Sequence, residues 1–188
     1  MTDATYFDDL YAHADDPWGL ATEAYEARKY ALTLAALPRA RYRRGFEPGC
    51  AIGVLTSALA ARCEALVSWD GAAAAVQQAT ERARAGHVRI EQHRVPGEWP
   101  DGSFDLVVVS ELLYFLEVDE RTRLYERVRA SLEPEGHLVA VHWRHAFDAA
   151  SGTGDEAHAE LATTPGWGRL VEHVEPDFLL GVWERQGG

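Results

Sequence analysis

Hydrophobic positions along the chain alternate between the spacing of strands and the spacing of helices. Residues 104–110, FDLVVVS, are apolar almost throughout, which is typical of a strand covered on both faces. Residues 65–69 and 137–143 predict further buried strands. Residues 88–93 alternate in the manner of a half-buried strand, and residues 43–47 predict a strand more weakly.

Between these strands the apolar side chains recur at helical intervals. The expected helices are residues 22–37 between two prolines, a segment after Gly53, the alanine-rich residues 72–85, and a helix carrying Leu124, Val128 and Leu132 that stops at Pro134. Residues 100–102 predict a turn, and residues 151–154 a loop or a helix start.

The end of the chain has a different pattern. Residues 168–174 and 177–184 are two strand-like runs joined by Glu175 and Pro176, which predicts a hairpin. Repeated strand–helix units before it predict an α/β fold with a Rossmann-like, doubly wound, mostly parallel sheet, to which the hairpin adds an antiparallel strand.

Composition and net charge limit the classes of ligand and partner that the chain is expected to bind. The 188 residues suggest one domain, and the formal net charge of −12 argues against binding to nucleic acid or to an anionic membrane. A cationic or neutral small ligand is compatible with this charge. No run is as long as a transmembrane helix, and the acidic, aromatic start does not resemble a signal peptide. Two cysteines and eight scattered histidines form no metal or disulfide motif, so we expect no metal and a reduced, cytoplasmic setting.

Candidate chemistry begins at residues 46–56, FEPGCAIGVLT, between a predicted strand and a predicted helix. Ligands of such sheets bind beyond the carboxyl ends of the strands, and glycine lets the backbone turn sharply there. Ala51 stands where a dinucleotide-binding loop has its middle glycine, and the lysine of a phosphate-binding loop is missing. The motif alone is therefore weak, and a plain tight turn also explains it.

A second element is Asp70, which ends the next predicted strand 21 residues after Gly49. A carboxylate there can accept hydrogen bonds from both ribose hydroxyls of a nucleoside, and capping of the following helix is the alternative. The loop and the acid together predict an adenosine-containing ligand, but they do not distinguish NAD from S-adenosylmethionine.

Longer motifs resemble class I S-adenosylmethionine-dependent methyltransferases, and most closely the NodS-like nodulation methyltransferases. The matching segments, spread from about residue 6 to residue 185, are DPW (16–18), EPGCAIGVLT (47–56), SWD (68–70), FDLVVVSELLYFLE (104–117), LEPEGHLV (132–139), VHWRH (141–145), TGDEAH (153–158) and DFLLGVW (177–183). The resemblance implies a seven-stranded sheet with an antiparallel last strand. It also implies one domain, residues 1–188, in which residues 1–40 form a helical lid and residues 41–188 the core.

The resemblance implies S-adenosylmethionine as cofactor and S-adenosylhomocysteine as product. The loop residues Glu47, Gly49, Cys50 and Gly53 would surround the methionine portion, and Asp70 would hold the ribose. Trp18 would lie in a segment that closes over the cofactor, and Lys29 or Arg28 would meet the methionine carboxylate. Trp18 as an anchor of the first helix, and Lys29 on a solvated helix face, are the alternatives. The remaining expected cofactor contacts are Gly71, Arg94, Val95 and Ser110.

The chain departs from the family pattern at the residues that would contact the adenine. The segment EQHRVP has His93 or Arg94 where many class I enzymes carry an acid. We expect backbone groups near Arg94 and Val95 to hold the adenine instead. Gly71 stands where a bulky apolar side chain often covers the ring, so both changes would weaken cofactor binding.

Residues after the fourth and fifth strands are candidates for the transfer itself. An amine acceptor must be neutral when it attacks, so a base or desolvation is needed. Glu111 would steer an ammonium and accept its proton, Tyr114 would hydrogen-bond the nucleophile, and His142 is a second candidate base. An N-cap role for Glu111, helix packing by Tyr114 and Phe115, and a structural histidine at 142 are the alternatives.

The segment 144–158 is expected to contact the acceptor. Arg144, Asp155 and His158 are the candidates, and Asp155 and His158 would share a helix face. Asp155 could equally stabilise the first turn of a helix through its dipole.

The sequence therefore predicts a small methyltransferase, a monomer or a homodimer. It would methylate an amine of a sugar-containing or other specialised small metabolite. An O-methyltransferase acting on a hydroxyl, and a non-catalytic adenosyl-nucleotide-binding module, are the alternatives. An NAD oxidoreductase is disfavoured by Ala51, because the pyrophosphate needs a close backbone approach at that position.

Overall fold

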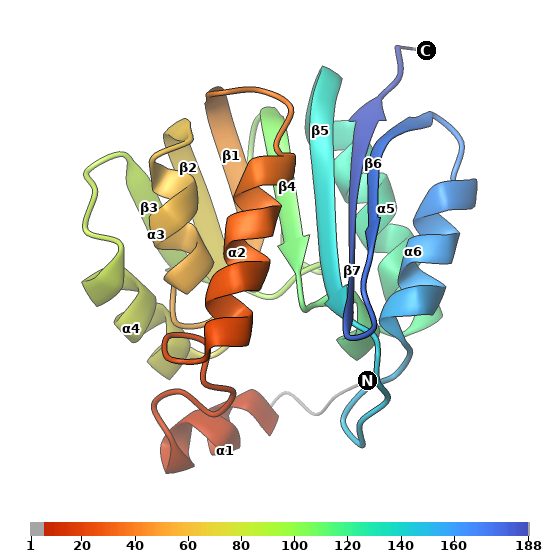
Figure 1. The fold of residues 1–188 in the computed structure, drawn as a ribbon. Helices are drawn as coiled ribbons and strands as arrows, with labels where there is room; N and C mark the ends of the chain where they lie inside the picture. The colour runs from red at the N-terminus through yellow and green to blue at the C-terminus, as the bar shows by residue number, and fades with distance from the viewer. Residues whose placement is uncertain (1–5, 188) are drawn as a thin grey trace.

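One seven-stranded sheet forms the centre of the molecule (Figure 1). The computed structural model describes residues 6–187. The strands are β1 (Tyr42–Pro48), β2 (Cys63–Asp70), β3 (Val88–Gln92), β4 (Phe104–Ser110), β5 (Leu132–Trp143), β6 (Trp167–Val174) and β7 (Phe178–Arg185). Their order is β3-β2-β1-β4-β5-β7-β6, and all neighbours from β3 to β5 are parallel. β7 is antiparallel to both β5 and β6, so the predicted fold class is confirmed.

Helices cover both faces of this sheet. They are α1 (Tyr6–His13), α2 (Ala24–Ala36), α3 (Val54–Ala60), α4 (Ala73–Arg82), the 3-10 turn η1 (Leu113–Phe115), α5 (Val118–Ser131) and α6 (Gly154–Thr163). Figure 1 shows α2, α3 and α4 on one face and α5 and α6 on the other, while α1 lies across the lower edge. The arrangement is the doubly wound sandwich that alternating strand and helix patterns predict.

The surroundings of β4 explain why this strand is apolar throughout. Val107 and Val109 belong to the core shared with α5 and α6, whereas Leu106 and Val108 belong to the core shared with α2 and α3. All four are at most 1% exposed. Burying each side chain contributes about 1.5–3 kcal/mol, so the central strand anchors both layers.

The N-terminal region has two parts that differ from the predicted lid of residues 1–40. α2 packs on the sheet through Tyr25, Tyr30 and Leu34, and so belongs to a core layer. α1 and the turn that follows it lie across the carboxyl edge of the sheet, where the Asp15 carbonyl accepts a hydrogen bond from Gln78 Nε2 at 2.9 Å. This first part therefore covers the edge, and residues 1–5 lie outside the described chain.

The boundary between α5 and β5 also differs from the prediction. The helix expected to reach Leu132 ends at Ser131, because Leu132 pairs with Phe104 and begins β5. The connection from β3 to β4 is irregular, and Trp99 within it packs against Phe46 at a ring-centroid distance of 4.9 Å.

Within residues 6–187, no helix combines the length and apolar character that crossing a bilayer requires. The same residues contain no group of three or more side chains arranged to hold a metal ion.

Candidate active site

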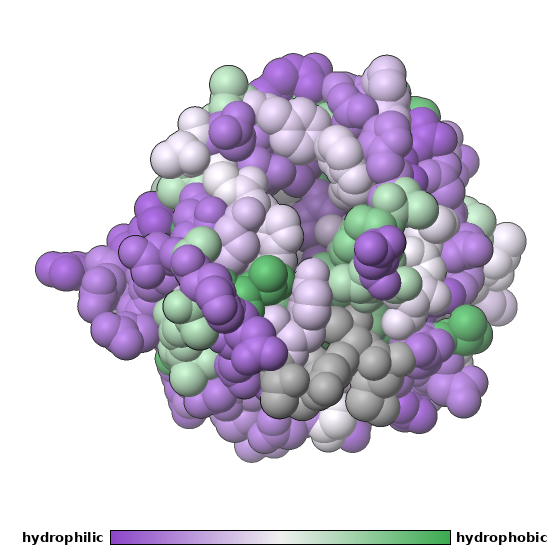
Figure 2. Space-filling view, turned by 90° about the horizontal axis from the view of Figure 1, so that it is seen from below, coloured by the Kyte–Doolittle hydropathy of each residue, from purple (hydrophilic) through white to green (hydrophobic). Residues whose placement is uncertain are grey.

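A cavity of about 850 Å³ opens at the carboxyl edge of the sheet. Figure 2 views the molecule from this side and shows a hollow bordered by hydrophobic and weakly polar residues. Among the predicted site residues, those that line the cavity are Trp18, Lys29, Glu47, Gly49, Cys50, Asp70, Gly71, Arg94, Val95, Ser110, Glu111 and Tyr114. Ligand sites of α/β sheets lie at this edge, and their volumes are typically about 300–1,000 Å³.

The loop after β1 forms one wall of the cavity. The backbone N–H groups of Gly49 and Cys50 both donate to the Trp69 carbonyl, at 2.7 and 2.9 Å, and so tie this loop to the end of β2. Gly49 (φ +77°) and Ala51 (φ +46°) both have left-handed backbone conformations. Ala51 therefore carries local strain of the kind that gathers at ligand sites.

Gly53 has a role different from the predicted one. It lies outside the cavity lining, and its φ is +79°. A Cβ atom at this position would come within 2.7 Å of the Ala79 Cα atom. The glycine thus allows α3 and α4 to pack closely, and the structure does not support direct contact with the methionine portion.

Asp70 joins the loop to the following helix. Its carboxylate accepts hydrogen bonds from the backbone N–H groups of Ala51 and Ala72, both at 2.9 Å. Burial raises the pKa of Asp70, and these two hydrogen bonds oppose that shift. The cap residue of α4 is Ala72, so Asp70 does not act as the N-cap of that helix.

Glu47 is a buried acid on the same wall, with 2% of its surface exposed. Its Oε2 atom accepts hydrogen bonds from the Thr56 and Ser68 hydroxyls at 2.6 and 2.9 Å. Burial raises the pKa of Glu47 to about 7, although both hydrogen bonds lower it. The charge of this carboxyl group therefore changes near neutral pH.

Arg94 lies beside Gly71, at the end of the cavity that we expect to hold the adenine. A Cβ atom at Gly71 would lie 3.2 Å from Arg94 Cγ and 3.4 Å from Arg94 Nε, so the Arg94 side chain occupies the space beside this glycine. Trp69 stacks on His93 with ring centroids 4.1 Å apart. The Arg94 side chain therefore fills space that a larger residue at position 71 would need.

α1 and the next turn close the cavity from below. Trp18 packs edge-on against Tyr11 at 5.8 Å, and Phe7 reaches Phe115 of η1 at 5.0 Å. Burial and the nearby charge of Asp70 raise the pKa of Tyr11, which places this phenol close to the expected ribose position. The sequence interpretation missed Phe7 and Tyr11, although their four-residue spacing in an otherwise acidic helix was a usable signal.

Lys29 is not on a solvated helix face, because its exposed fraction is 2%. Its Nζ donates to Glu26 Oε1 at 2.8 Å and to Glu111 Oε1 at 2.6 Å. Arg28 lies outside the cavity lining and forms a bidentate ion pair with Glu175. Neither basic residue is therefore free for the methionine carboxylate in this arrangement.

Glu111 follows β4 with a left-handed φ of +54°. Besides Lys29, two groups donate to its Oε2 atom, the Tyr114 hydroxyl at 2.5 Å and the Trp143 backbone N–H at 2.8 Å. Burial and the Glu111 charge raise the pKa of Tyr114 well above its usual value. Glu111 therefore fixes the cavity wall, and most of its acceptor capacity is already used.

His142 is fully buried and does not line the cavity. Its Nε2 accepts the Leu113 backbone N–H at 3.1 Å, so its Nδ1 carries the proton and donates to His158 Nε2, also at 3.1 Å. Burial lowers the pKa of His142 well below its usual value and that of His158 to about 4. The structure supports the alternative reading of a structural histidine and no role as base.

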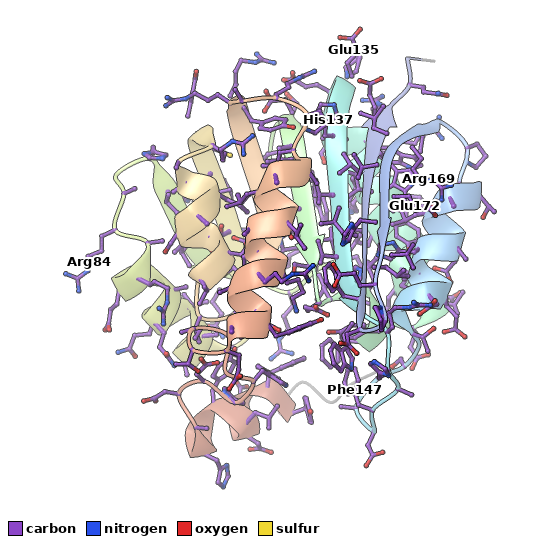
Figure 3. The ribbon with its side chains drawn as sticks, in the orientation of Figure 1. Arg84, Glu135, His137, Phe147, Arg169 and Glu172 are labelled. Carbon is purple, nitrogen blue, oxygen red and sulfur yellow. The ribbon has the colours of Figure 1, made fainter. Side chains whose placement is uncertain are left out.

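The predicted acceptor residues of segment 144–158 also lie outside the cavity lining. Arg144 pairs with Asp155 at 2.7 Å near the start of α6, which Thr153 caps. His158 is bonded to His142, as described above. Other residues of this region, Trp143 and Phe147, do line the cavity, and Figure 3 shows Phe147 below the carboxyl end of β5.

The profile of the family described as "Nodulation protein S (NodS)" matches residues 8–164. The chain belongs to the nodulation protein S family. This membership confirms the resemblance that the sequence motifs carry.

Two members of the nodulation protein S family illustrate the relationship. The chain is 32% identical over 129 residues to nodulation protein S of Rhizobium tropici, an alignment that covers 67% of this chain and 54% of that protein. It is 32% identical over 150 residues to nodulation protein S of Bradyrhizobium diazoefficiens, covering 72% and 70%. The matched region spans 54% of the Rhizobium tropici protein and 60% of the Sinorhizobium fredii protein, so it is a part of those two relatives.

Solved structures agree with the fold. The crystal structure of the N-methyltransferase NodS from Bradyrhizobium japonicum, in complex with S-adenosylhomocysteine, superposes with a TM-score of 0.83 at 27% identity and covers 97% of this chain and 99% of that one. A candidate methyltransferase from Pseudomonas syringae is 47% identical, with a TM-score of 0.77 and coverage of 87% and 100%.

Proposed function

We propose that the protein is an S-adenosylmethionine-dependent methyltransferase that methylates an amine of a small, sugar-containing or other specialised metabolite. The observation that carries the proposal is the cavity between the loop after β1 and Asp70, in a chain of the nodulation protein S family. The crystallised NodS relative is an N-methyltransferase with S-adenosylhomocysteine bound.

The residues present fit this cofactor. Asp70 offers carboxylate oxygens for the ribose hydroxyls, and Glu47 offers a buried acid beside the cationic methionine portion. Arg94 would cover the adenine, while Tyr11 and Trp18 would exclude water from above the ribose. When bound, S-adenosylmethionine supplies a methyl group that its sulfonium already activates, so the protein's task is positioning and desolvation.

The other half of the cavity suits an amine better than an anion. Glu26, Lys29 and Glu111 are bonded together there, and two carboxylates against one ammonium leave a formal charge of −1. The aromatic side chains of Tyr114, Trp143 and Phe147 line the same region. Aromatic faces and negative charge together attract ammonium groups.

The proposal is tested first by thermal shift with S-adenosylhomocysteine, S-adenosylmethionine and NADH. A ligand that binds the native state raises its melting temperature, so we expect the first two to stabilise the protein and NADH to leave it unchanged. Transfer of a labelled methyl group to a panel of amino sugars, and to matching sugars without the amine, then separates N-methylation from O-methylation. Stabilisation without any transfer would indicate a non-catalytic binding module.

The remaining expectations stay predictions. We expect a monomer or a homodimer in the cytoplasm, with a small-molecule acceptor and no nucleic-acid partner. The negative charge of the chain and its two free, buried cysteines support these expectations.

A further inference from the structure

Glu26 is an acidic residue of the cavity lining that the sequence interpretation did not select. It lies in the first turn of α2, lines the cavity, and is 8% exposed. Its Oε1 atom accepts the hydrogen bond from Lys29 at 2.8 Å. Its Oε2 atom is buried and has no hydrogen-bond partner.

An unpartnered carboxylate oxygen is unusual in a protein interior. Leaving a buried acceptor unsatisfied costs about 1–3 kcal/mol, and more when the group is charged. The neighbouring Tyr25 hydroxyl is also buried without a hydrogen-bond partner, and Tyr25 lines the same cavity. Two adjacent orphaned polar groups on one cavity wall indicate that a ligand completes their hydrogen bonding.

The charged and titratable groups around Glu26 define what this ligand can be. Lys29 is already shared between Glu26 and Glu111. Burial, the Glu26 charge and the polar contact between the Tyr30 phenol and the Glu26 carboxylate raise the pKa of Tyr30. Glu47 and Tyr114 also line this cavity and present an acid and a phenol. The surroundings contain more acceptors and negative charge than donors, so the missing group is a hydrogen-bond donor with positive charge.

Aromatic rings around Tyr25 strengthen this conclusion. The Tyr25 ring packs edge-on against Trp143 at 5.5 Å, and Lys29 Nζ already lies 5.0 Å from the Tyr25 centroid. Tyr114 and Phe147 contact each other at 5.1 Å on the same side of the cavity. An alkylammonium group is stabilised by such rings as well as by the carboxylate.

Building on the proposed function, we propose that Tyr25 and Glu26 form the subsite for the acceptor's amine, with the Glu26 carboxylate as its proton acceptor. The amine enters as an ammonium group. It gives one proton to Glu26 and keeps the electron pair of that N–H bond as the lone pair needed for attack. Rotation about the terminal torsion of Glu26, which has a broad minimum, presents one carboxylate oxygen to the cavity and loosens the hydrogen bond of the other oxygen to Lys29.

Glu26 suits this role better than Glu111. Glu111 accepts hydrogen bonds from Lys29, Tyr114 and the Trp143 backbone, and its backbone is fixed in a left-handed conformation. Glu26 Oε1 accepts the hydrogen bond from Lys29, the Tyr30 phenol lies nearby, and Oε2 has no hydrogen-bond partner of good geometry. Glu111 therefore positions the wall, and Glu26 binds the amine.

The test measures binding by calorimetry, with the protein saturated by S-adenosylhomocysteine. The probe is glucosamine, and N-acetylglucosamine is its neutral counterpart. We expect the parent to bind glucosamine in preference to N-acetylglucosamine. Glu26→Gln should lose about tenfold or more of the affinity for glucosamine, because the hydrogen bond between an ammonium group and a carboxylate is charge-assisted. Glu23→Gln, an exposed acid one turn earlier, is the matched control and should bind like the parent.

Each other outcome overturns the inference. Equal glucosamine affinities of Glu26→Gln and the parent would exclude the Glu26 carboxylate from the subsite. No preference of the parent for glucosamine over N-acetylglucosamine would remove the ammonium subsite, while stabilisation by S-adenosylhomocysteine would leave the proposed function intact. A large loss of S-adenosylhomocysteine affinity in Glu26→Gln would assign the carboxylate to the methionine ammonium instead.

Tyr25→Phe provides a second test that keeps the fold. It removes one hydroxyl that has no protein partner. We expect an unchanged melting temperature and an affinity for glucosamine that is lower by severalfold. Unchanged glucosamine affinity in this variant would exclude Tyr25 from the subsite.

Discussion

At the scale of single residues, the site depends on four buried or half-buried acids with different surroundings. Asp70 is held by backbone N–H groups, Glu47 by two hydroxyls, and Glu111 by a lysine, a phenol and a backbone N–H. Glu26 alone among these four has a buried oxygen without a partner. Their surroundings, more than their residue type, separate the roles of binding, positioning and proton transfer.

The pKa of Glu47, about 7, predicts that cofactor binding depends on pH. A cationic ligand beside Glu47 favours its ionised form, so binding releases a proton wherever the free protein holds one. Affinity for S-adenosylmethionine should therefore rise about three- to tenfold from about pH 6 to about pH 8 and level off above. Calorimetry at several pH values checks this. Glu47→Gln should bind with little pH dependence, and an equally steep profile in that variant would contradict the assignment.

Arg94 allows a test of the adenine end. Its side chain fills the space beside Gly71, so Arg94→Ala should weaken S-adenosylhomocysteine binding by about 1 kcal/mol, which is close to fivefold. Arg89, an exposed arginine paired with Glu91 on β3, provides the control variant Arg89→Ala, which should bind normally. Equal affinities of the two variants, measured by calorimetry, would exclude Arg94 as the cover of the adenine ring.

At the scale of elements, close packing of α3 against α4 positions the loop after β1. Gly53→Ala would place a methyl group 2.7 Å from Ala79 Cα in a left-handed backbone, and should destabilise the protein by about 2–4 kcal/mol. Gly86→Ala is the control, because nothing lies within 4 Å of a Cβ atom there. Urea unfolding measures both changes, and similar small effects would contradict the packing role.

Elements with a strong periodic pattern were predictable from the sequence. β4 has the bounds expected from residues 104–110, and the hairpin of β6 and β7 lies where its turn signal is. The end of α5 was misplaced because Leu132 fits both a helix face and the strand that pairs with Phe104. Local periodicity cannot distinguish a helical Leu132 from one in a strand, because the deciding contact, with Phe104, is remote in sequence.

The site was predictable only in part, for the same reason. The loop and Asp70 follow from the order of strands, because topology brings strand ends together. Glu26, Tyr11 and Phe7 lie on helices, and their approach to the cavity depends on how those helices cross the sheet edge. His142 was misassigned because its residue type fits a base, whereas its hydrogen bonds to Leu113 and His158 appear only in the fold.

At the scale of the whole molecule, the buried histidine pair links stability to pH. The pKa of His158 is lowered to about 4 in the folded protein, so between this value and about 6.5 the unfolded chain binds more protons than the folded one. Stability should fall as the pH decreases through this window. His158→Gln should reduce that loss, and His13→Gln, at an exposed position, should not. Urea unfolding at several pH values would contradict this account if all three proteins lost stability equally.

The molecule as a whole is a sheet whose carboxyl edge is enclosed by α1, η1 and the start of α2. The half of the cavity proposed for the cofactor lies at the ends of β1 and β2, and the acidic, aromatic half lies at the ends of β4 and β5. The proposed reaction needs both halves to open into one space, as the continuous cavity provides.

The most direct test of this arrangement is a crystal structure of the protein grown with S-adenosylhomocysteine. We predict density in the cavity, with the ribose hydroxyls within hydrogen-bonding distance of the Asp70 carboxylate and the adenine beside Arg94. Density for the ligand elsewhere on the protein, or a cavity that stays free of it at saturating concentration, would contradict the assignment.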